Sequence, residues 1–159
     1  MFKRILNIEL PPKQSVFLWG ARQTGKSQFL KQHFKNSVYY DLLDTHEAAR
    51  LIKAPYLLRE EILAMPPEKL AHPVIIDEIQ KIPELLNEVH WMIENSNAQF
   101  ILCGSSARKL KTQSTNLLGG RAWQYNFYPL SLIILVVLLC RTRLGNLAVN
   151  LRSKEKDTP

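Results

Sequence analysis

The sequence predicts an α/β fold in three layers, with helices on both faces of a mainly parallel five-stranded sheet. Three observations lead to this prediction. Short β-prone runs alternate with segments of helical periodicity, which is typical of parallel sheets. A glycine-rich loop at residues 20–27 joins the first such run to the first such helix. Residues 74–76 are continuously apolar, as expected of a strand that is buried on both faces of a sheet.

Five runs are expected to form the strands. They are rich in β-branched, aromatic or other apolar side chains, and turn residues bound most of them. The expected strands are residues 15–20, 37–44, 74–76, 99–103 and 123–127.

Helical periodicity separates these strands. In the first helix, which follows the glycine-rich loop, three apolar side chains recur on one face: Phe29, Leu30 and Phe34. A second helix is expected to begin near Thr45, because residues 44 and 47 have the spacing of a capping box. A further helix at residues 56–64 lies between prolines, and another follows Pro83, which suits a first helical turn.

Residues 20–27 read GARQTGKS and match the phosphate-binding pattern G-x-x-x-x-G-K-[ST] in full. Gly20 and Gly25 are expected to allow a tight turn whose backbone N–H groups wrap the phosphates of a nucleotide. Lys26 is expected to contact the β- and γ-phosphate oxygens, and the Ser27 hydroxyl to bind Mg²⁺. The predicted nucleotide-binding residues are Gly20, Ala21, Arg22, Gln23, Thr24, Gly25, Lys26, Ser27 and Gln28.

The third expected strand ends in two acids, Asp77 and Glu78, about fifty residues after the loop. Asp77 would hold Mg²⁺ beside Ser27, directly or through water. Glu78 would orient and partly deprotonate the water that attacks the γ-phosphate. This second acid favours an ATPase, and the guanine-reading Asn-Lys-x-Asp of GTPases is absent from the sequence. Residues 117–121 resemble the signature of transporter ATPases, but that signature should precede the acids, so this class is excluded.

Two further side chains are candidates for contact with the γ-phosphate region. Ser105 ends the fourth expected strand and could hydrogen-bond the attacking water or the phosphate; Ser106 is the weaker candidate. Ser105 could instead cap a helix beginning near residue 107. Arg121 follows two glycines and could act as an arginine finger, in cis or toward a neighbouring subunit. The alternative for Arg121 is an ordinary surface arginine.

The composition is that of a globular chain with room for one domain: 159 residues, 46% hydrophobic and 22% charged. Cys103 and Cys140 lie in apolar runs, which favours small buried side chains in a reducing cytoplasm. The four histidines lack metal-ligand spacing, and no apolar run of signal-peptide length follows the N-terminus. The sequence therefore predicts a cytoplasmic protein without a metal knuckle.

The net charge of +7 is unevenly distributed. Lys and Arg outnumber Asp and Glu seven to one in residues 1–36 and nine to two in residues 101–159. A triphosphate needs a positive cradle, which explains part of the first excess. The second could favour nucleic acid or an anionic membrane surface, or it could be a solvated tail.

Four stretches together resemble a prokaryotic family of AAA-type P-loop ATPases. They span residues 15–132 and read FLWGARQTGKS, VIIDEIQKIPELLNEVHWMIE, FILCGSSARKL and LLGGRAWQYNFYPLSL. The resemblance implies an ATP-binding fold in which the strand before Ser105 lies between the strands that lead to the loop and to the acid pair. It also implies that Ser105 is the sensor position and that Arg121 belongs to the family's GGRA segment. Full-length members carry a C-terminal domain of unknown function.

The chain departs from this family after Leu132. Residues 132–140 form an unpatterned apolar run that is too short to span a bilayer, and a basic tail follows. The run is either a buried strand or helix, or the mark of a truncated or frame-shifted relative; the remaining residues are too few for the usual helical lid with its second sensor arginine. We expect the ATPase domain at residues 1–131 and no independent domain at residues 132–159.

The ordered motifs predict Mg²⁺-dependent binding of ATP and its hydrolysis. One alternative is a non-catalytic, nucleotide-dependent interaction module or a truncated remnant. Another is a nucleic-acid-binding ATPase, favoured by the basic C-terminal block. Besides ATP, the expected partners are a second copy of the chain or another protein, with nucleic acid as the alternative, and no transmembrane segment is expected.

Overall fold

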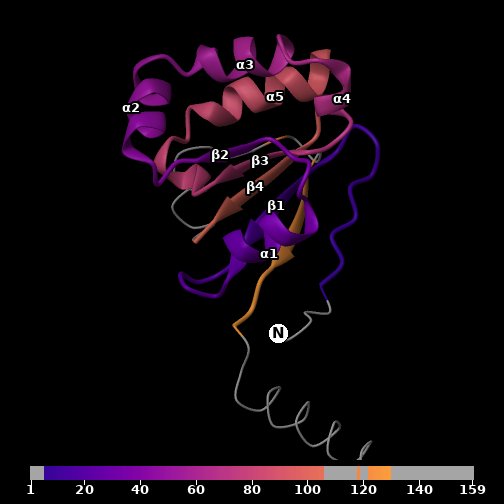
Figure 1. The fold of residues 1–159 in the computed structure, drawn as a ribbon, viewed down its shortest axis with the longest axis vertical. Coiled ribbons are helices and arrows are strands. Elements are labelled where there is room, and N and C mark those ends of the chain that lie inside the picture. Colours follow the sequence, from indigo (N-terminus) through magenta and orange to yellow (C-terminus); the bar gives the residue numbers. More distant parts are fainter. Residues whose placement is uncertain (1–5, 106–117, 119–121, 130–159) are drawn as a thin grey trace, which may run out of the picture. The chain divides into compact units, whose positions relative to one another are not determined.

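The computed structural model describes residues 6–105, 118 and 122–129. All of these except Pro129 belong to one compact unit, Met1–Tyr128. Five parallel strands form one sheet in the order β2-β3-β4-β1-β5. The strands are β1 (Ser15–Trp19), β2 (Tyr39–Asp41), β3 (Val74–Asp77), β4 (Phe100–Gly104) and β5 (Ala122–Asn126). The predicted α/β class with a mainly parallel five-stranded sheet is confirmed (Figure 1).

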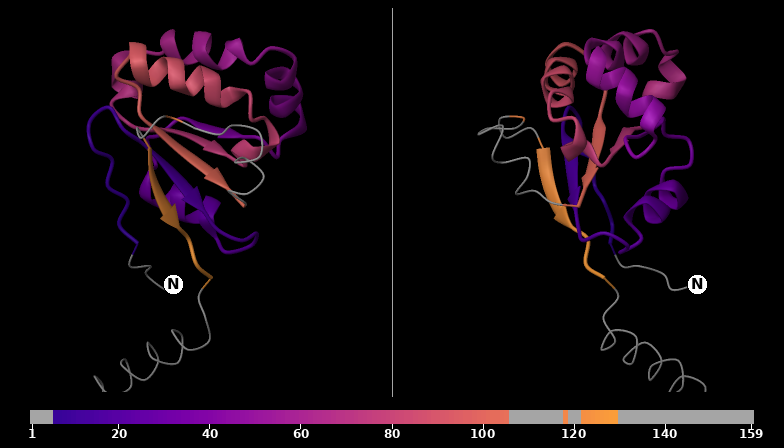
Figure 2. Two further views of the ribbon diagram at one scale, coloured as in Figure 1. Left: turned by 180° about the vertical axis from the view of Figure 1, so that it is seen from behind. Right: turned by 90° about the vertical axis from the view of Figure 1, so that its left-hand side faces the viewer.

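Helices cover both faces of this sheet. The α-helices are α1 (Lys26–His33), α2 (Thr45–Lys53), α3 (Tyr56–Leu63), α4 (Pro67–Leu70) and α5 (Leu85–Asn95), and a 3₁₀ turn, η1 (Ile79–Lys81), follows β3. In Figure 1, α1 lies on one side of the strands, and α2, α3 and α5 lie on the other. β5 lies at the edge of the sheet beside β1 (Figure 2). The three predicted layers are therefore present.

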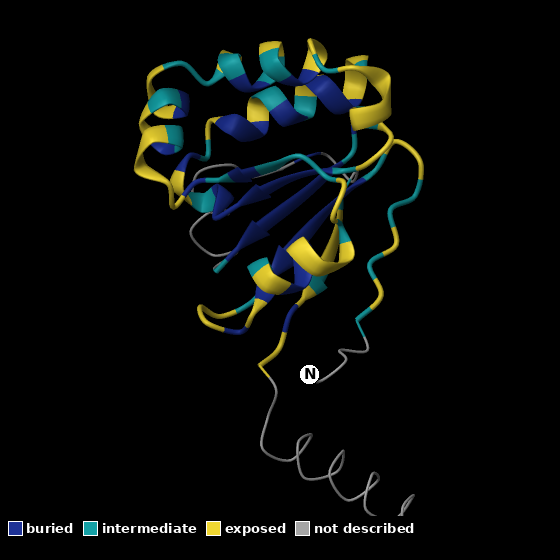
Figure 3. Ribbon diagram, in the orientation of Figure 1, coloured by how far each residue is buried: buried dark blue, intermediate teal, exposed yellow. Residues whose placement is uncertain are grey.

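The alternation of side chains along each strand builds two separate cores. Phe17, Trp19 and Ile76 belong to the cluster that packs against α2, α3 and α5. Leu18 and Ile75, one position away, belong to the cluster that packs against α1. Both strand faces are buried, as the continuous dark blue of the central strands in Figure 3 shows. This burial explains why residues 74–76 have no polar position.

The strand order brings the predicted motifs to one edge of the sheet. β4 pairs with β1 on one side and with β3 on the other, as the family resemblance implied. Because all strands are parallel, the segments that follow β1, β3 and β4 leave the sheet at the same edge. These segments are the glycine-rich loop, the acid pair and Ser105. The fold thus gathers residues that lie up to 85 positions apart in the chain.

Local expectations differ from the structure at the helix after Pro83, at β2 and at the capping box. α5 begins at Leu85 with Glu84 as its N-cap, so Pro83 precedes the first helical turn. β2 ends at Asp41 and not at residue 44, because the Asp41 carboxylate accepts the Leu43 N–H at 3.0 Å and turns the chain. The capping box is only half formed. Asp44 accepts the His46 N–H at 2.8 Å, but Glu47 pairs with Arg50 at 2.5 Å, and the Asp44 N–H bonds to Asp41.

Several sequence-based expectations lie outside the described residues. They concern Ser106, Arg121, Cys140, the apolar run at residues 132–140 and the basic tail. Among the helices that the structure describes, none has the length and apolar character needed to cross a membrane.

Candidate functional site

The two glycines of the phosphate-binding loop have different structural tasks. Gly25, the N-cap of α1, has φ 85, a left-handed conformation that glycine adopts at no steric cost. Gly20 instead provides space, since a Cβ at this position would lie 2.3 Å from the carbonyl oxygen of Phe127. Phe127 is held there by its own N–H, which donates to the Trp19 carbonyl at 2.5 Å. The need for space at Gly20 is a constraint that the sequence analysis did not predict.

The Gly20→Ala variant is expected to lose about 1–3 kcal/mol of unfolding free energy, because the new methyl group overpacks a backbone contact that cannot rotate away. Chemical denaturation of the two proteins in the same buffer measures this difference. A variant as stable as the parent would show that the segment after β5 moves without cost.

The Lys26 ammonium group lies inside the loop. It donates to the carbonyl oxygens of Gly20 at 2.6 Å and Ala21 at 2.8 Å. The Thr24 hydroxyl also donates to the Ala21 carbonyl, at 2.9 Å. Lys26 is only 6% exposed and Thr24 7%. These contacts fix the loop and keep a positive charge at its centre, where phosphate oxygens would lie.

Ser27 and Asp77 meet at the C-terminal edge of the sheet. The Ser27 hydroxyl donates to Asp77 Oδ2 at 2.6 Å, and Asp77 is 2% exposed. A hydroxyl and a carboxylate are the oxygen donors that Mg²⁺ prefers, together with water and substrate phosphates. No group of three His, Cys, Asp or Glu side chains that could hold a metal occurs in the described part of the chain. The donor set therefore fits a magnesium ion that is shared with a phosphate, since such an ion needs no all-protein cage.

Tyr39 is a contact of Asp77 that sequence reasoning missed. Its hydroxyl donates to Asp77 Oδ2 at 2.5 Å, so this oxygen accepts hydrogen bonds from both Tyr39 and Ser27. Burial first, and then the Asp77 carboxylate, raises the pKa of Tyr39 well above its usual value. The hydroxyl therefore remains a donor at every physiological pH. Lys31 lies 4.8 Å from the centre of the Tyr39 ring. The contact between Tyr39 and Asp77 depends on the pairing of β2 with β3, which local sequence patterns do not reveal.

The Tyr39→Phe variant is expected to lose about 1.5–3 kcal/mol of unfolding free energy, because one hydrogen bond to a charged group disappears while the ring still packs. Urea denaturation measures the loss. Tyr56→Phe is the matched control, since that ring is 50% exposed. Equal stabilities of the two variants would contradict a structural role for the Tyr39 hydroxyl.

Glu78 has an unusual backbone conformation for a glutamate. Its φ of 59 is left-handed, a conformation that costs free energy for any residue with a Cβ and is frequent at functional sites. The Glu78 side chain is 8% exposed. Its Oε2 atom accepts hydrogen bonds from Ser105 Oγ at 3.4 Å and from the Gln80 amide group. The structure thus brings Glu78 and Ser105 together.

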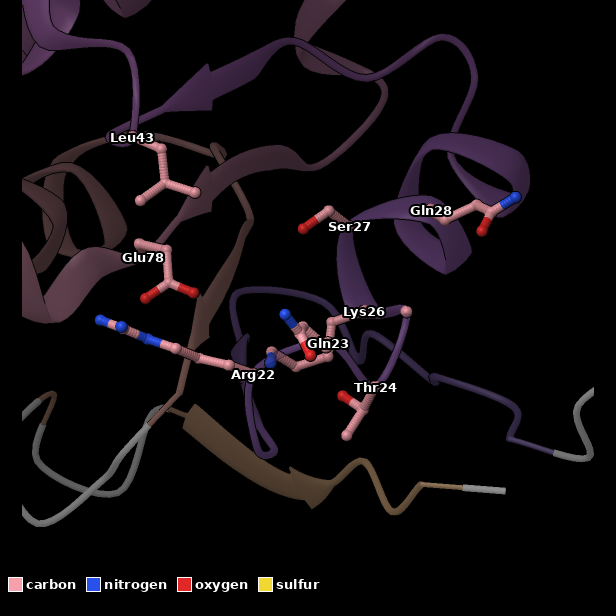
Figure 4. Close-up of a pocket in the computed structure, with 9 residues that line it drawn as sticks. Arg22, Gln23, Thr24, Lys26, Ser27, Gln28, Leu43 and Glu78 are labelled. Atoms are coloured by element: carbon pink, nitrogen blue, oxygen red, sulfur yellow. The ribbon is translucent and has the colours of Figure 1, made fainter. Parts of the chain in front are cut away.

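A pocket of about 390 Å³ lies between the loop and Glu78, and Asp77 and Ser105 are not among the residues that line it. This volume is within the usual range for small-molecule sites. Figure 4 shows Arg22 extending toward Glu78, and the Ser27 hydroxyl directed into the space beside it. Of the predicted nucleotide-binding residues, Gly20 and Ala21 are not among those that line the pocket, whereas Leu43 lines it without having been predicted. The lining residues are Arg22, Gln23, Thr24, Gly25, Lys26, Ser27, Gln28, Leu43 and Glu78.

Cys103 lies beneath this site as a fully buried thiol, as the sequence predicted. It pairs in register with Asp77 across β3 and β4. Burial first, and then the Asp77 carboxylate, raises the pKa of Cys103 well above its usual value. A thiol held in its protonated form is a poor nucleophile, so Cys103 belongs to the packing and not to the chemistry.

A family model described as an AAA domain matches residues 12–133. No curated protein matches the chain. The matched region includes the loop, Asp77, Glu78, Ser105 and all five strands.

Proposed function

The chain belongs to the AAA-domain family, and from this membership and the geometry of the pocket we propose that it binds ATP together with Mg²⁺ and hydrolyses ATP to ADP and phosphate. One observation carries the proposal. Ser27 Oγ lies 2.6 Å from Asp77 Oδ2, and Ser27 lines a pocket that Lys26 and Glu78 also line. A cation ligand pair, a fixed positive charge and a carboxylate around one cavity are the parts that phosphoryl transfer needs.

Each group has a distinct task in this proposal. The backbone N–H groups of the loop and the N-terminus of α1 bind the phosphates, and Lys26 neutralises their negative charge. Ser27 and Asp77 would hold Mg²⁺, which supplies charge neutralisation and orientation at the β- and γ-phosphates. Glu78 orients the attacking water and accepts its proton at a side-chain carboxylate oxygen. The Ser105 hydroxyl donates a hydrogen bond close to the attacking water. We take residues 1–131 as the ATPase domain.

Removal of the divalent cation is the direct test of this function. The purified chain is expected to release phosphate from saturating ATP in the presence of Mg²⁺, and release is expected to fall to background when EDTA is added in excess. A continuous phosphate assay measures both rates. Isothermal titration with ATP is the companion measurement. ATP binding without phosphate release would favour a non-catalytic, nucleotide-dependent interaction module, and the absence of both would overturn the proposal.

A further inference from the structure

Gln80 lies between the two residues that we assign to the γ-phosphate region. It belongs to η1, directly after the acid pair. Its Nε2 group donates to Glu78 Oε2 and to Ser105 Oγ at 3.1 Å. The Ser105 hydroxyl donates in turn to Glu78 Oε2 at 3.4 Å. Gln80, Glu78 and Ser105 thus form a closed triad, in which one amide nitrogen contacts both other members.

The fold anchors the backbone around Gln80. Its neighbour Ile79 is fully buried, and Ile82 is 1% exposed. The ammonium group of Lys81 donates to the Leu42 carbonyl at 2.8 Å and so ties η1 to the segment after β2. The 3₁₀ turn is therefore fixed on both sides of Gln80, which fixes the point from which its side chain extends toward Glu78 and Ser105.

Gly104 provides the space that the amide group of Gln80 occupies. A Cβ at position 104 would lie 2.4 Å from Gln80 Oε1 and 2.7 Å from the Trp19 ring. Gln80 Oε1 is buried and has no hydrogen-bond partner among the described residues. The opposite orientation of the amide would place this oxygen against the Glu78 carboxylate. A buried acceptor without a partner is costly, so the two bonds made by Nε2 decide how the amide points.

We propose that Gln80 is a positioning residue, which holds the Glu78 carboxylate in place at the pocket through the hydrogen-bonded triad that Ser105 completes. Glu78 lines the pocket, whereas Gln80 and Ser105 do not, and Gln80 therefore acts through Glu78. The inference rests on the proposed function for the role of Glu78 in hydrolysis. The triad itself is a property of the protein without nucleotide.

The kinetic test replaces the amide group and keeps the length of the side chain. Gln80→Met is expected to lower kcat about tenfold while the Kd for ATP stays within twofold. Gln124→Met, at an exposed position of β5, is the matched control and should leave both values unchanged. In a Glu78→Gln background, Gln80→Met should change kcat less than twofold, because the amide at position 78 can no longer act as the base whose position matters. If Gln80→Met lowered kcat by the same factor in the parent protein and in the Glu78→Gln variant, its effect would be a general structural one. That result would overturn the inference.

A second test needs no nucleotide. Gln80→Met, Glu78→Met and the double variant form a thermodynamic cycle in the equilibrium constant of unfolding. The two substitutions are expected to be non-additive by about tenfold, since each removes the partner of the other. Additive effects would show that the two side chains do not interact, and would overturn the inference.

The outcomes separate this inference from the proposed function. If Glu78→Gln reduced turnover and Gln80→Met left it unchanged, the inference would be overturned and the proposed function would stand. A parent protein that binds ATP without turnover would overturn the hydrolysis part of the proposed function. In that case the thermodynamic cycle of unfolding decides. Non-additive effects of Gln80→Met and Glu78→Met on the unfolding equilibrium would support the contact between the two side chains, and additive effects would reject it.

Discussion

ATP affinity is expected to fall at least about 100-fold, to an undetectable level in a standard titration, when Lys26 is replaced by alanine. The ammonium group of Lys26 is held at the centre of the loop by two backbone carbonyl oxygens. In the complex, its charge would lie against the phosphate oxygens. Loss of charge-assisted hydrogen bonds of about 1.5–3 kcal/mol each is sufficient for this reduction. Isothermal titration calorimetry with ATP and Mg²⁺ measures the affinity.

The control for Lys26→Ala is Lys69→Ala, which removes an exposed lysine of α4. Circular dichroism and thermal unfolding establish that both variants are folded, because Lys26 also contributes contacts to the loop. A folded Lys26→Ala protein with the ATP affinity of the parent would rule out this loop as the nucleotide site.

Glu78→Gln is expected to retain ATP binding and to slow turnover at least tenfold, which corresponds to about 1.4 kcal/mol of activation free energy. The amide cannot accept a proton from water as the carboxylate does. Its shape is almost the same, and its oxygen can still accept the hydrogen bonds that Gln80 and Ser105 now donate. The variant therefore separates the chemistry from the packing.

Steady-state phosphate release gives kcat for Glu78→Gln, and a binding titration gives the Kd. Glu68→Gln is the matched control, because this glutamate is exposed on α4. Turnover at the rate of the parent would leave Glu78 without a catalytic task. Loss of ATP binding would instead point to a collapse of the pocket.

The features that could be predicted are those that depend on residues close together in the sequence. Gly25, Lys26 and Ser27 lie within three positions, and their spacing alone predicts a loop followed by a helix. The acids at the end of β3 follow a fully apolar run, and this local contrast was sufficient to predict the strand end. The position of β4 between β1 and β3 did not follow from local patterns, and only the family resemblance implied it.

The features that could not be predicted depend on distant contacts. Tyr39 and Asp77 are 38 positions apart, and only the parallel register of β2 and β3 brings them together. The left-handed backbone of Glu78 has no sequence signal, since glutamate rarely adopts it. Gln80 reads as one more polar residue after the acids, until the geometry of η1 directs its amide toward Glu78. The length of β2 was overestimated because Asp41 satisfies a backbone N–H with its own side chain.

The contact between Gly20 and Phe127 has a consequence for how this sequence can drift in evolution. A side chain at position 20 would collide with a backbone oxygen more than a hundred positions away, whether or not a nucleotide is ever bound. Selection for a stable sheet would therefore preserve Gly20 in a descendant that had lost all affinity for phosphate. Gly20 alone is thus a poor marker of the proposed activity, whereas loss of Lys26 or Glu78, in the roles proposed above, would be an early sign of its decay.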